Sequence, residues 1–266
     1  MRDEYWKLEQ FGKIPKLNKM IFIEGLPGIG NVGKVAVDFL IDELKAIKLY
    51  EITSYTFPHS VFVNEDNLVE LPIVEVFYRQ SGSKRDIILL GGDVQPVDEI
   101  SSYEFSGKVL EMAQKFNVKE IITLGGIGLN DIPKKPKVYC TGNSKKIIEA
   151  YKSELVSNKL YGVVGPIVGV SGLLLGLASR KNIGAVSLLA ETYGHPMYLG
   201  IKGAKEILKV LNKKLDLRID VNKLDREIKD IESEIIKKTE QLNEVTKQVA
   251  LNKLQKRIGK DVDYIG

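Results

Sequence analysis

Two short runs of apolar residues, each ending in glycine, most constrain the fold of this chain. Ile87-Ile88-Leu89-Leu90 ends in Gly91-Gly92-Asp93, and Ile121-Ile122-Thr123-Leu124 ends in Gly125-Gly126. An unbroken apolar run of this length is typical of a strand that is buried on both faces of a sheet. A predicted helix, from about residue 101 to 116, lies between the two runs. The repeat of strand, glycine turn and helix predicts an α/β fold with a mostly parallel sheet covered on both faces.

Similar patterns recur along the first four-fifths of the chain. Apolar residues at helical spacing predict helices over 31–46, 171–181 and 202–215. Apolar runs or alternation predict strands over 20–24, 47–55, 68–78, 163–167 and 185–189. Residues 1–18 are expected to be a lead-in segment. We therefore expect one α/β core domain over residues 1–215.

The sequence changes after residue 216, because no glycine or proline occurs between Gly203 and Gly259. Apolar residues in this region follow a spacing of three and four, as in a coiled-coil seam. These residues are Val221, Leu224, Ile228, Ile231, Ile235, Leu242, Val245 and Val249. One helix over 221–258 would be about 57 Å long, too long to lie flat on a domain of this size. A projecting coiled coil, a helical hairpin and a solvated helix packed on its own domain all fit the pattern.

We accordingly expect a helical extension over residues 216–258 and a short flexible tail over 259–266. The seam would mediate self-association or contact a client protein through apolar side chains.

A glycine-rich loop follows the first predicted strand and matches two phosphate-binding patterns by letter. Gly28, Gly30 and Gly33 give G-x-G-x-x-G, whereas Gly28, Gly33 and Lys34 give G-x-x-x-x-G-K with Val35 in place of the Ser or Thr that would bind Mg²⁺. The dinucleotide pattern also needs an acidic residue at the end of the next strand. Glu51 has about the right distance but lies within its strand.

Two interpretations of this loop stay open. The residues Gly28, Gly30, Asn31, Gly33 and Lys34, with the strand-end Asp93, could bind a nucleotide or nucleoside in an enzyme. Alternatively, the glycines allow the strand and the next helix to pack closely.

Composition limits the other classes of function. The net charge is +4, from 39 basic and 35 acidic residues, and this near-balance argues against a dedicated nucleic-acid surface. The uncharged stretch from Leu160 to Ser179 is broken by glycines and proline, so we interpret it as a buried loop and helix rather than a membrane span. The charged N-terminus lacks the apolar run of a signal peptide.

Cysteine and histidine are scarce. The single cysteine, Cys140, cannot form an intramolecular disulfide or a thiolate metal cluster, and a reducing cytoplasm is the simplest setting. The two histidines, His59 and His195, are not spaced as metal ligands. Ser171 lacks the second glycine of a hydrolase nucleophile elbow. Asp93 and Asp98 follow a strand end, where they could bind a ligand or cap the next helix. We therefore expect no catalytic centre, no metal and no cofactor.

Four ordered segments over residues 20–215 resemble those of the proteasome assembly chaperone family, in its archaeal branch. The loop Gly25–Lys34, between its strand and Val35–Leu40, resembles the opening motif of that family. Leu90–Pro96 resembles its Gly-Asp-x-Gln element at a strand end. Gly165–Leu175 resembles its glycine-rich turn into a buried helix, and Leu188–Gly194 resembles its last strand and turn. The chain departs at His195-Pro196-Met197-Tyr198, where the family often has Pro-Asp.

The resemblance implies a three-layer α/β/α core similar to that of nucleoside phosphorylases. It also implies homo-oligomers that hold proteasome α subunits or other client proteins without ATP and without catalysis. Some relatives dock on the proteasome α-ring through a C-terminal hydrophobic–Tyr–any-residue tail. This chain ends Asp263-Tyr264-Ile265-Gly266. The tyrosine is third from the end rather than second, and Asp263 rather than a hydrophobic residue precedes it, so the tail resembles the docking motif only loosely. On this basis we expect a cytoplasmic, non-enzymatic chaperone or assembly factor, with the nucleotide-binding enzyme as the alternative.

Overall fold

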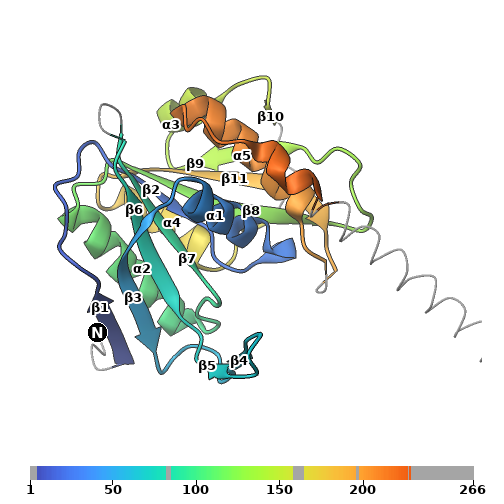
Figure 1. The fold of residues 1–266 in the computed structure, drawn as a ribbon. Helices are drawn as coiled ribbons and strands as arrows, with labels where there is room; N and C mark the ends of the chain where they lie inside the picture. The colour runs from blue at the N-terminus through green and yellow to red at the C-terminus, as the bar shows by residue number, and fades with distance from the viewer. Residues whose placement is uncertain (1–4, 82–84, 158–164, 196–197, 227, 229–266) are drawn as a thin grey trace, which may run out of the picture. The chain divides into compact units, whose positions relative to one another are not determined.

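A nine-stranded sheet forms the centre of the fold (Figure 1). The computed structural model describes residues 5–81, 85–157, 165–195, 198–226 and 228. The strand order is β1-β3-β6-β7-β2-β8-β11-β9-β10. The bounds of its strands are β1 Trp6–Gln10, β2 Ile21–Glu24, β3 Ile47–Ser54, β6 Val74–Arg79, β7 Ile87–Gly92, β8 Glu120–Leu129, β9 Val138–Gly142, β10 Val156–Ser157 and β11 Gly184–Tyr193.

Parallel pairing holds for the four central strands, β7, β2, β8 and β11. The sheet as a whole is mixed, because β6, β3 and β1 add antiparallel strands on one side and β9 pairs antiparallel with β11 on the other. The expectation of a mostly parallel sheet therefore applies to its centre. The reason is the connections: β3, β6 and β7 follow one another without an intervening crossover helix, and a parallel neighbour needs such a crossover.

Helices cover both faces of the sheet and give the three layers that the sequence predicts. Helices α1 (Val32–Glu43) and α5 (Ile201–Leu215) pack against each other on one face, and α2 (Glu99–Lys115) and α4 (Val170–Ser179) do so on the other. The short helix α3 (Lys145–Tyr151) lies by β9. None of these described helices is both long and apolar enough to cross a membrane.

The main hydrophobic core lies between the sheet and the α2–α4 layer. Phe22, Ile88 and Ile121 from three central strands pack there with Phe105 of α2 and Leu174 of α4, and all five are fully buried. Alternate residues of the same strands point to the opposite face, because side chains alternate along a strand. Central strands with apolar residues on both faces are the physical reason for the unbroken apolar runs in the sequence.

The N-terminal segment is more structured than the sequence suggested. Strand β1 pairs antiparallel with β3, so this part of the predicted lead-in belongs to the sheet. Trp6 is buried, and its ring lies 5.8 Å from that of Phe57 and 5.5 Å from that of Phe105 between centroids. The indole N–H of Trp6 donates a hydrogen bond to Glu104 at 3.2 Å.

Two strand predictions are wrong in part. The predicted strand over 68–78 is divided into β5 (Val69–Glu70) and β6, because Pro72 lies between them and lacks the N–H that a strand ladder needs. Of the predicted strand over 163–167, the described residues Gly165–Ile167 are not a strand. They form the approach to α4 instead.

Strands β9 and β10 and helix α3 were not predicted. Two further short strands, β4 (Phe62–Val63) and β5, form a separate hairpin. The described residues between 5 and 222 form one compact unit. The proposed division at residues 215 and 258 stays a prediction.

Candidate functional site

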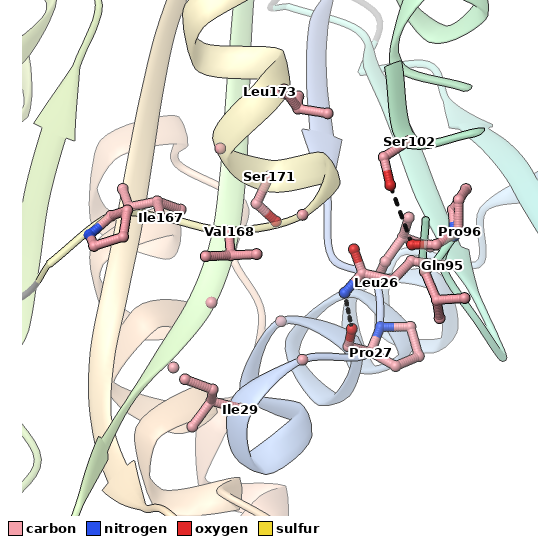
Figure 2. A pocket seen from close by; sticks show the side chains of 18 of the residues that line it. Leu26, Pro27, Ile29, Gln95, Pro96, Ser102, Ile167, Val168, Ser171 and Leu173 are labelled. Atoms are coloured by element: carbon pink, nitrogen blue, oxygen red, sulfur yellow. Dashed lines mark hydrogen bonds between the residues drawn. The ribbon is translucent and has the colours of Figure 1, made fainter. Parts of the chain in front are cut away.

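A cleft of about 900 Å³ opens at the carboxyl ends of the central strands. Its described lining residues come mainly from four segments, the loop after β2, the segment after β7, the end of β8 and the approach to α4. These segments are Leu26–Ile29, Gln95–Tyr103, Leu124–Gly128 and Gly165–Leu173 (Figure 2). Ligands of open α/β sheets usually bind in this place, because loops from adjacent strands diverge there. We therefore treat this cleft as the candidate functional site.

A buried carboxylate lies behind the cleft wall. Glu24 ends β2 and is fully buried. One of its oxygens accepts the N–H of Leu26 at 3.1 Å, and the other accepts the hydroxyl of Ser171 at 2.9 Å. Burial raises the pKa of Glu24 to about 7, although both hydrogen bonds act to lower it. Because Ser171 itself lines the cleft, the protonation state of Glu24 decides whether this hydroxyl donates its hydrogen to the carboxylate or is free to donate elsewhere.

The side chain of Gln95 connects three of the four segments through hydrogen bonds. Its amide nitrogen donates to the carbonyl of Pro27 at 2.6 Å, and its amide oxygen accepts the N–H of Val170, the first residue of α4, at 3.2 Å. Gly169 before that helix has a φ of +86°, and a Cβ there would lie 2.6 Å from the amide oxygen of Gln95. Glycine is therefore required at position 169, both because the positive φ disfavours other residues and because there is no room for a Cβ beside Gln95.

The charges around the cleft do not suit an anion. Asp98 and Glu99 are its charged lining residues in the described part of the chain, and no lysine, arginine or histidine lines it there. Asp98 caps α2 by accepting the N–H of Ser101 at 2.9 Å, which confirms one of the two roles expected for it. Hydrogen bonds at this cap lower the pKa of Asp98. A phosphate group in the cleft would meet carboxylates without a basic side chain to balance its charge.

Two glycines of the predicted phosphate loop, Gly30 and Gly33, have a packing role. A Cβ on Gly33 would lie 2.4 Å from the carbonyl oxygen of Leu124 in β8, and one on Gly25 would lie 2.2 Å from the carbonyl oxygen of Gly33. Helix α1 thus approaches the sheet backbone more closely than any larger residue permits. Gly30 has a φ of +60° and lies against Thr192 of β11. Close packing therefore explains Gly30 and Gly33, whereas a Cβ on Gly28 would meet no atom within 4 Å.

The other residues of the nucleotide hypothesis are only partly brought together. Asn31 precedes α1 in the left-handed conformation, with a φ of +50°. Lys34 forms an ion pair with Asp38 at 3.1 Å and a longer one with Asp93 at 3.8 Å. Gly28 and Gly33 line the cleft, but Lys34 and Asp93 are not among its described lining residues. Lys34 is therefore held by two carboxylates outside the cleft.

Most residues of the predicted seam and tail lie outside the described part of the chain. Val221 is in the short 3-10 helix η3 (Val221–Lys223), Leu224 is buried, and Ile228 is helical and partly buried. The residues beyond the described part are Ile231, Ile235, Leu242, Val245, Val249, Tyr264, Ile265 and Gly266. The seam and the tail stay predictions.

Glu24 is the residue that sequence reasoning missed. An acidic residue that directly follows an apolar run and precedes a glycine turn was the available signal. Cys140 lies in β9, and burial raises the pKa of its thiol to about 11. Among the described residues, no group of three or more His, Cys, Asp or Glu side chains is arranged to hold a metal ion.

Comparisons with known proteins give a consistent picture. An uncharacterized protein of Methanocaldococcus jannaschii is 30% identical over 253 residues, which is 95% of each chain. The crystal structure of Pyrococcus furiosus PbaB, an archaeal proteasome activator, is similar with a TM-score of 0.80 and 38% identity over 89% of this chain and 99% of that chain. That of Pyrococcus furiosus PbaA, an archaeal homolog of proteasome-assembly chaperone, is similar with a TM-score of 0.70 and 26% identity over 97% and 99%.

The model of the PAC2 family matches residues 22–238, which include the described lining of the cleft and every strand of the nine-stranded sheet except β1 and the first residue of β2. The chain belongs to the PAC2 family.

Proposed function

We propose that this protein is a non-enzymatic, ATP-independent chaperone or assembly factor that binds proteasome α subunits or other client proteins. The observation that carries this proposal is the likeness to the proteasome activator PbaB, at 38% identity over 99% of that chain. The likeness to PbaA supports the same class of function. A relation of this extent includes the core and its surface loops, and so supports a shared mode of action as well as a shared fold.

The structure gives the nucleotide-binding alternative little support. Its lysine is paired with Asp38 and Asp93, and two of its three glycines, Gly30 and Gly33, are in close packing contacts. The described lining of the cleft contains no basic side chain. A nucleotide would have to bind with its phosphates beside Asp98 and Glu99, which is electrostatically unfavourable.

The proposal includes three finer points. The protein is a homo-oligomer in the cytoplasm, its seam over Val221–Val249 forms a coiled coil, and Tyr264, Ile265 and Gly266 contact the proteasome α-ring. The heptad spacing supports the second point, and the resemblance of the tail to a docking motif supports the third. The likeness of the core to nucleoside phosphorylases also stays a prediction from the resemblance.

A capture experiment tests the function. Purified archaeal proteasome α-subunit rings are passed over the immobilised full-length chain without nucleotide. We expect the rings to be retained, and retention to fall at least tenfold when Tyr264–Gly266 is deleted. Tyr55→Ala is the matched control, because Tyr55 is an exposed tyrosine outside the tail. Failure of the full-length chain to retain the rings, or any other client from a native lysate, would refute the proposed function.

A further inference from the structure

Strand β8 has one edge that is only partly paired within the sheet. Strand β2 ends at Glu24, which lies opposite Thr123 of β8, whereas β8 continues to Leu129. Beyond Thr123, β8 stays paired with β11 on one side, and no strand of the described chain pairs with its other side. This unpaired stretch, residues 124–129, therefore presents backbone N–H and C=O groups along one edge.

The unpaired stretch forms one wall of the cleft. Its first five residues, 124–128, all line the cleft. At about 3.3 Å per residue they extend over roughly 17 Å, which is the length of an ordinary strand in a globular protein. The volume of about 900 Å³ is that of sites that bury most of a drug-sized ligand. The cleft can therefore hold a short extended segment of polypeptide beside this edge.

Apolar side chains from several segments are exposed within the same cleft. Val168 and Val97, which precede α4 and α2, have 82 and 78% of their surface exposed, and Tyr103 and Ile29 have 56 and 54%. Figure 2 shows that Ile29 and Val168 come from different segments around one opening. A bound segment that covered these side chains would be stabilised by the burial of apolar surface.

Two hydroxyl groups of the cleft offer hydrogen-bond acceptors to a ligand. The hydroxyl of Ser171 donates to the carboxylate of Glu24 at 2.9 Å, and that of Ser102 donates to the carbonyl of Pro96 at 3.3 Å. Each hydroxyl has one hydrogen, so in this arrangement only its lone pairs remain for a ligand. A ligand with N–H donors fits both groups.

Two carboxylates at the start of α2 add negative charge to the lining. Hydrogen bonds at the helix cap lower the pKa of Asp98, which is therefore ionised at neutral pH, and Glu99 follows it in the cleft lining. No basic side chain balances them among the described lining residues. Lysine and arginine combine positive charge with several N–H donors. Charge complementarity therefore indicates a partner with a basic side chain.

We propose that the cleft binds an extended segment of a client protein, which pairs with the unpaired stretch of β8 and places a lysine or arginine beside Asp98 and Glu99. Extended peptides add to strand edges through main-chain hydrogen bonds, and pockets for alternate side chains select their sequence. The exposed apolar side chains of the cleft would take the neighbouring residues of the segment. This inference rests on the proposed function, because it names the part of a client that the chaperone binds.

The test is a fluorescence anisotropy titration of a short labelled peptide with the full-length chain. The peptide alternates valine and lysine and is blocked at both ends. We expect saturable binding, and binding about tenfold weaker when glutamate replaces each lysine. A third peptide carries a methyl group on every backbone nitrogen and keeps the side chains and the charge. It should also bind about tenfold more weakly, because it cannot donate backbone hydrogen bonds to β8.

A pair of charge variants tests whether the peptide lies in the cleft. Asp98→Asn with Glu99→Gln removes both carboxylates and keeps the cap of α2, because asparagine caps a helix as well as aspartate does. Glu65→Gln with Asp66→Asn is the matched control, because this exposed acidic pair lies outside the described cleft lining. We expect the cleft variant to bind the lysine peptide about fivefold more weakly and the control to bind it as the unsubstituted chain does.

The outcomes separate this inference from the proposed function. Deletion of Tyr264–Gly266 should leave the affinity for the peptide unchanged. No saturable binding, equal binding of the lysine and glutamate peptides, or no loss of affinity on methylation would overturn the inference. If proteasome rings are retained in any of these cases, the proposed function stands without it. Peptide binding by a chain that retains neither rings nor another client would support the cleft as a peptide site and refute the proposed function.

Discussion

The buried carboxylate of Glu24 makes the stability of this protein depend on pH in an unusual direction. The folded chain holds a carboxyl group whose pKa is about 7, against 4.5 when it is exposed to water. Between these two values the folded state retains a proton that the unfolded state has lost. The free energy of unfolding contributed by this group is therefore largest below pH 4.5, falls as pH rises through the interval, and is constant again above pH 7.

Glu24→Gln isolates this effect. Glutamine matches the protonated carboxyl in shape, because its oxygen can accept the N–H of Leu26 and its nitrogen can donate to the hydroxyl of Ser171. It carries no charge at any pH and so avoids the cost of burying one. A rise in the pKa from 4.5 to about 7 corresponds to about 3 kcal/mol. We expect the unfolding free energy of the variant minus that of the unsubstituted chain to increase by that amount as pH rises from 4 to 8.

The assay is urea denaturation of both chains at half-unit intervals from pH 4 to pH 8.5. The difference between the two unfolding free energies is the quantity of interest, because all other titrating groups are common to both chains. Ser171→Ala should extend the upper end of the window to higher pH, since it removes a hydrogen bond that lowers the pKa of Glu24 in the folded state. Glu99→Gln, at an exposed position, is the control for loss of a carboxyl group. A difference that stays flat across the pH range, or an equal gain in the control, would refute the reasoning.

Three further predictions concern the loop contacts and the cleft. Gly33→Ala should lower the unfolding free energy by about 1–3 kcal/mol or more, because the new Cβ meets the carbonyl of Leu124. Gly28→Ala is the control and should change the unfolding free energy little, because the space around Gly28 is open. Thermal melts compare the two variants. Gln95→Ala should cost roughly 1–3 kcal/mol by leaving a backbone carbonyl and an N–H without their partner, and should speed hydrogen exchange at the start of α4. Calorimetric titration of the protein with phosphate, ATP or NAD should give no binding heat, because Lys34 is paired with two carboxylates and the described cleft lining holds no basic side chain. Measurable heat that disappears in a Lys34→Ala variant would contradict this expectation.

The sequence by itself determined the central architecture. The runs at 87–90 and 121–124 predicted strands buried on both faces, and both are central strands of the parallel part of the sheet. The position of Asp98 predicted either a ligand contact or a helix cap, and the structure contains the cap. These features could be predicted from the sequence because apolar periodicity and helix capping depend on residues that are close in the chain. The four ordered motifs also predicted the family correctly.

Only the tertiary structure decided how the cleft is built. Glu24 and Ser171 are 147 residues apart, and Gln95 joins residues 68 and 75 positions away from it. Strand β9 was missed because its five residues carry no strong pattern and become a strand by pairing with β11. Such contacts depend on which loops and sheet edges meet after the sheet has formed, and no local sequence pattern predicts those long-range contacts. The pKa of Glu24 follows from the same cause, because burial arises from the packing of distant segments around it.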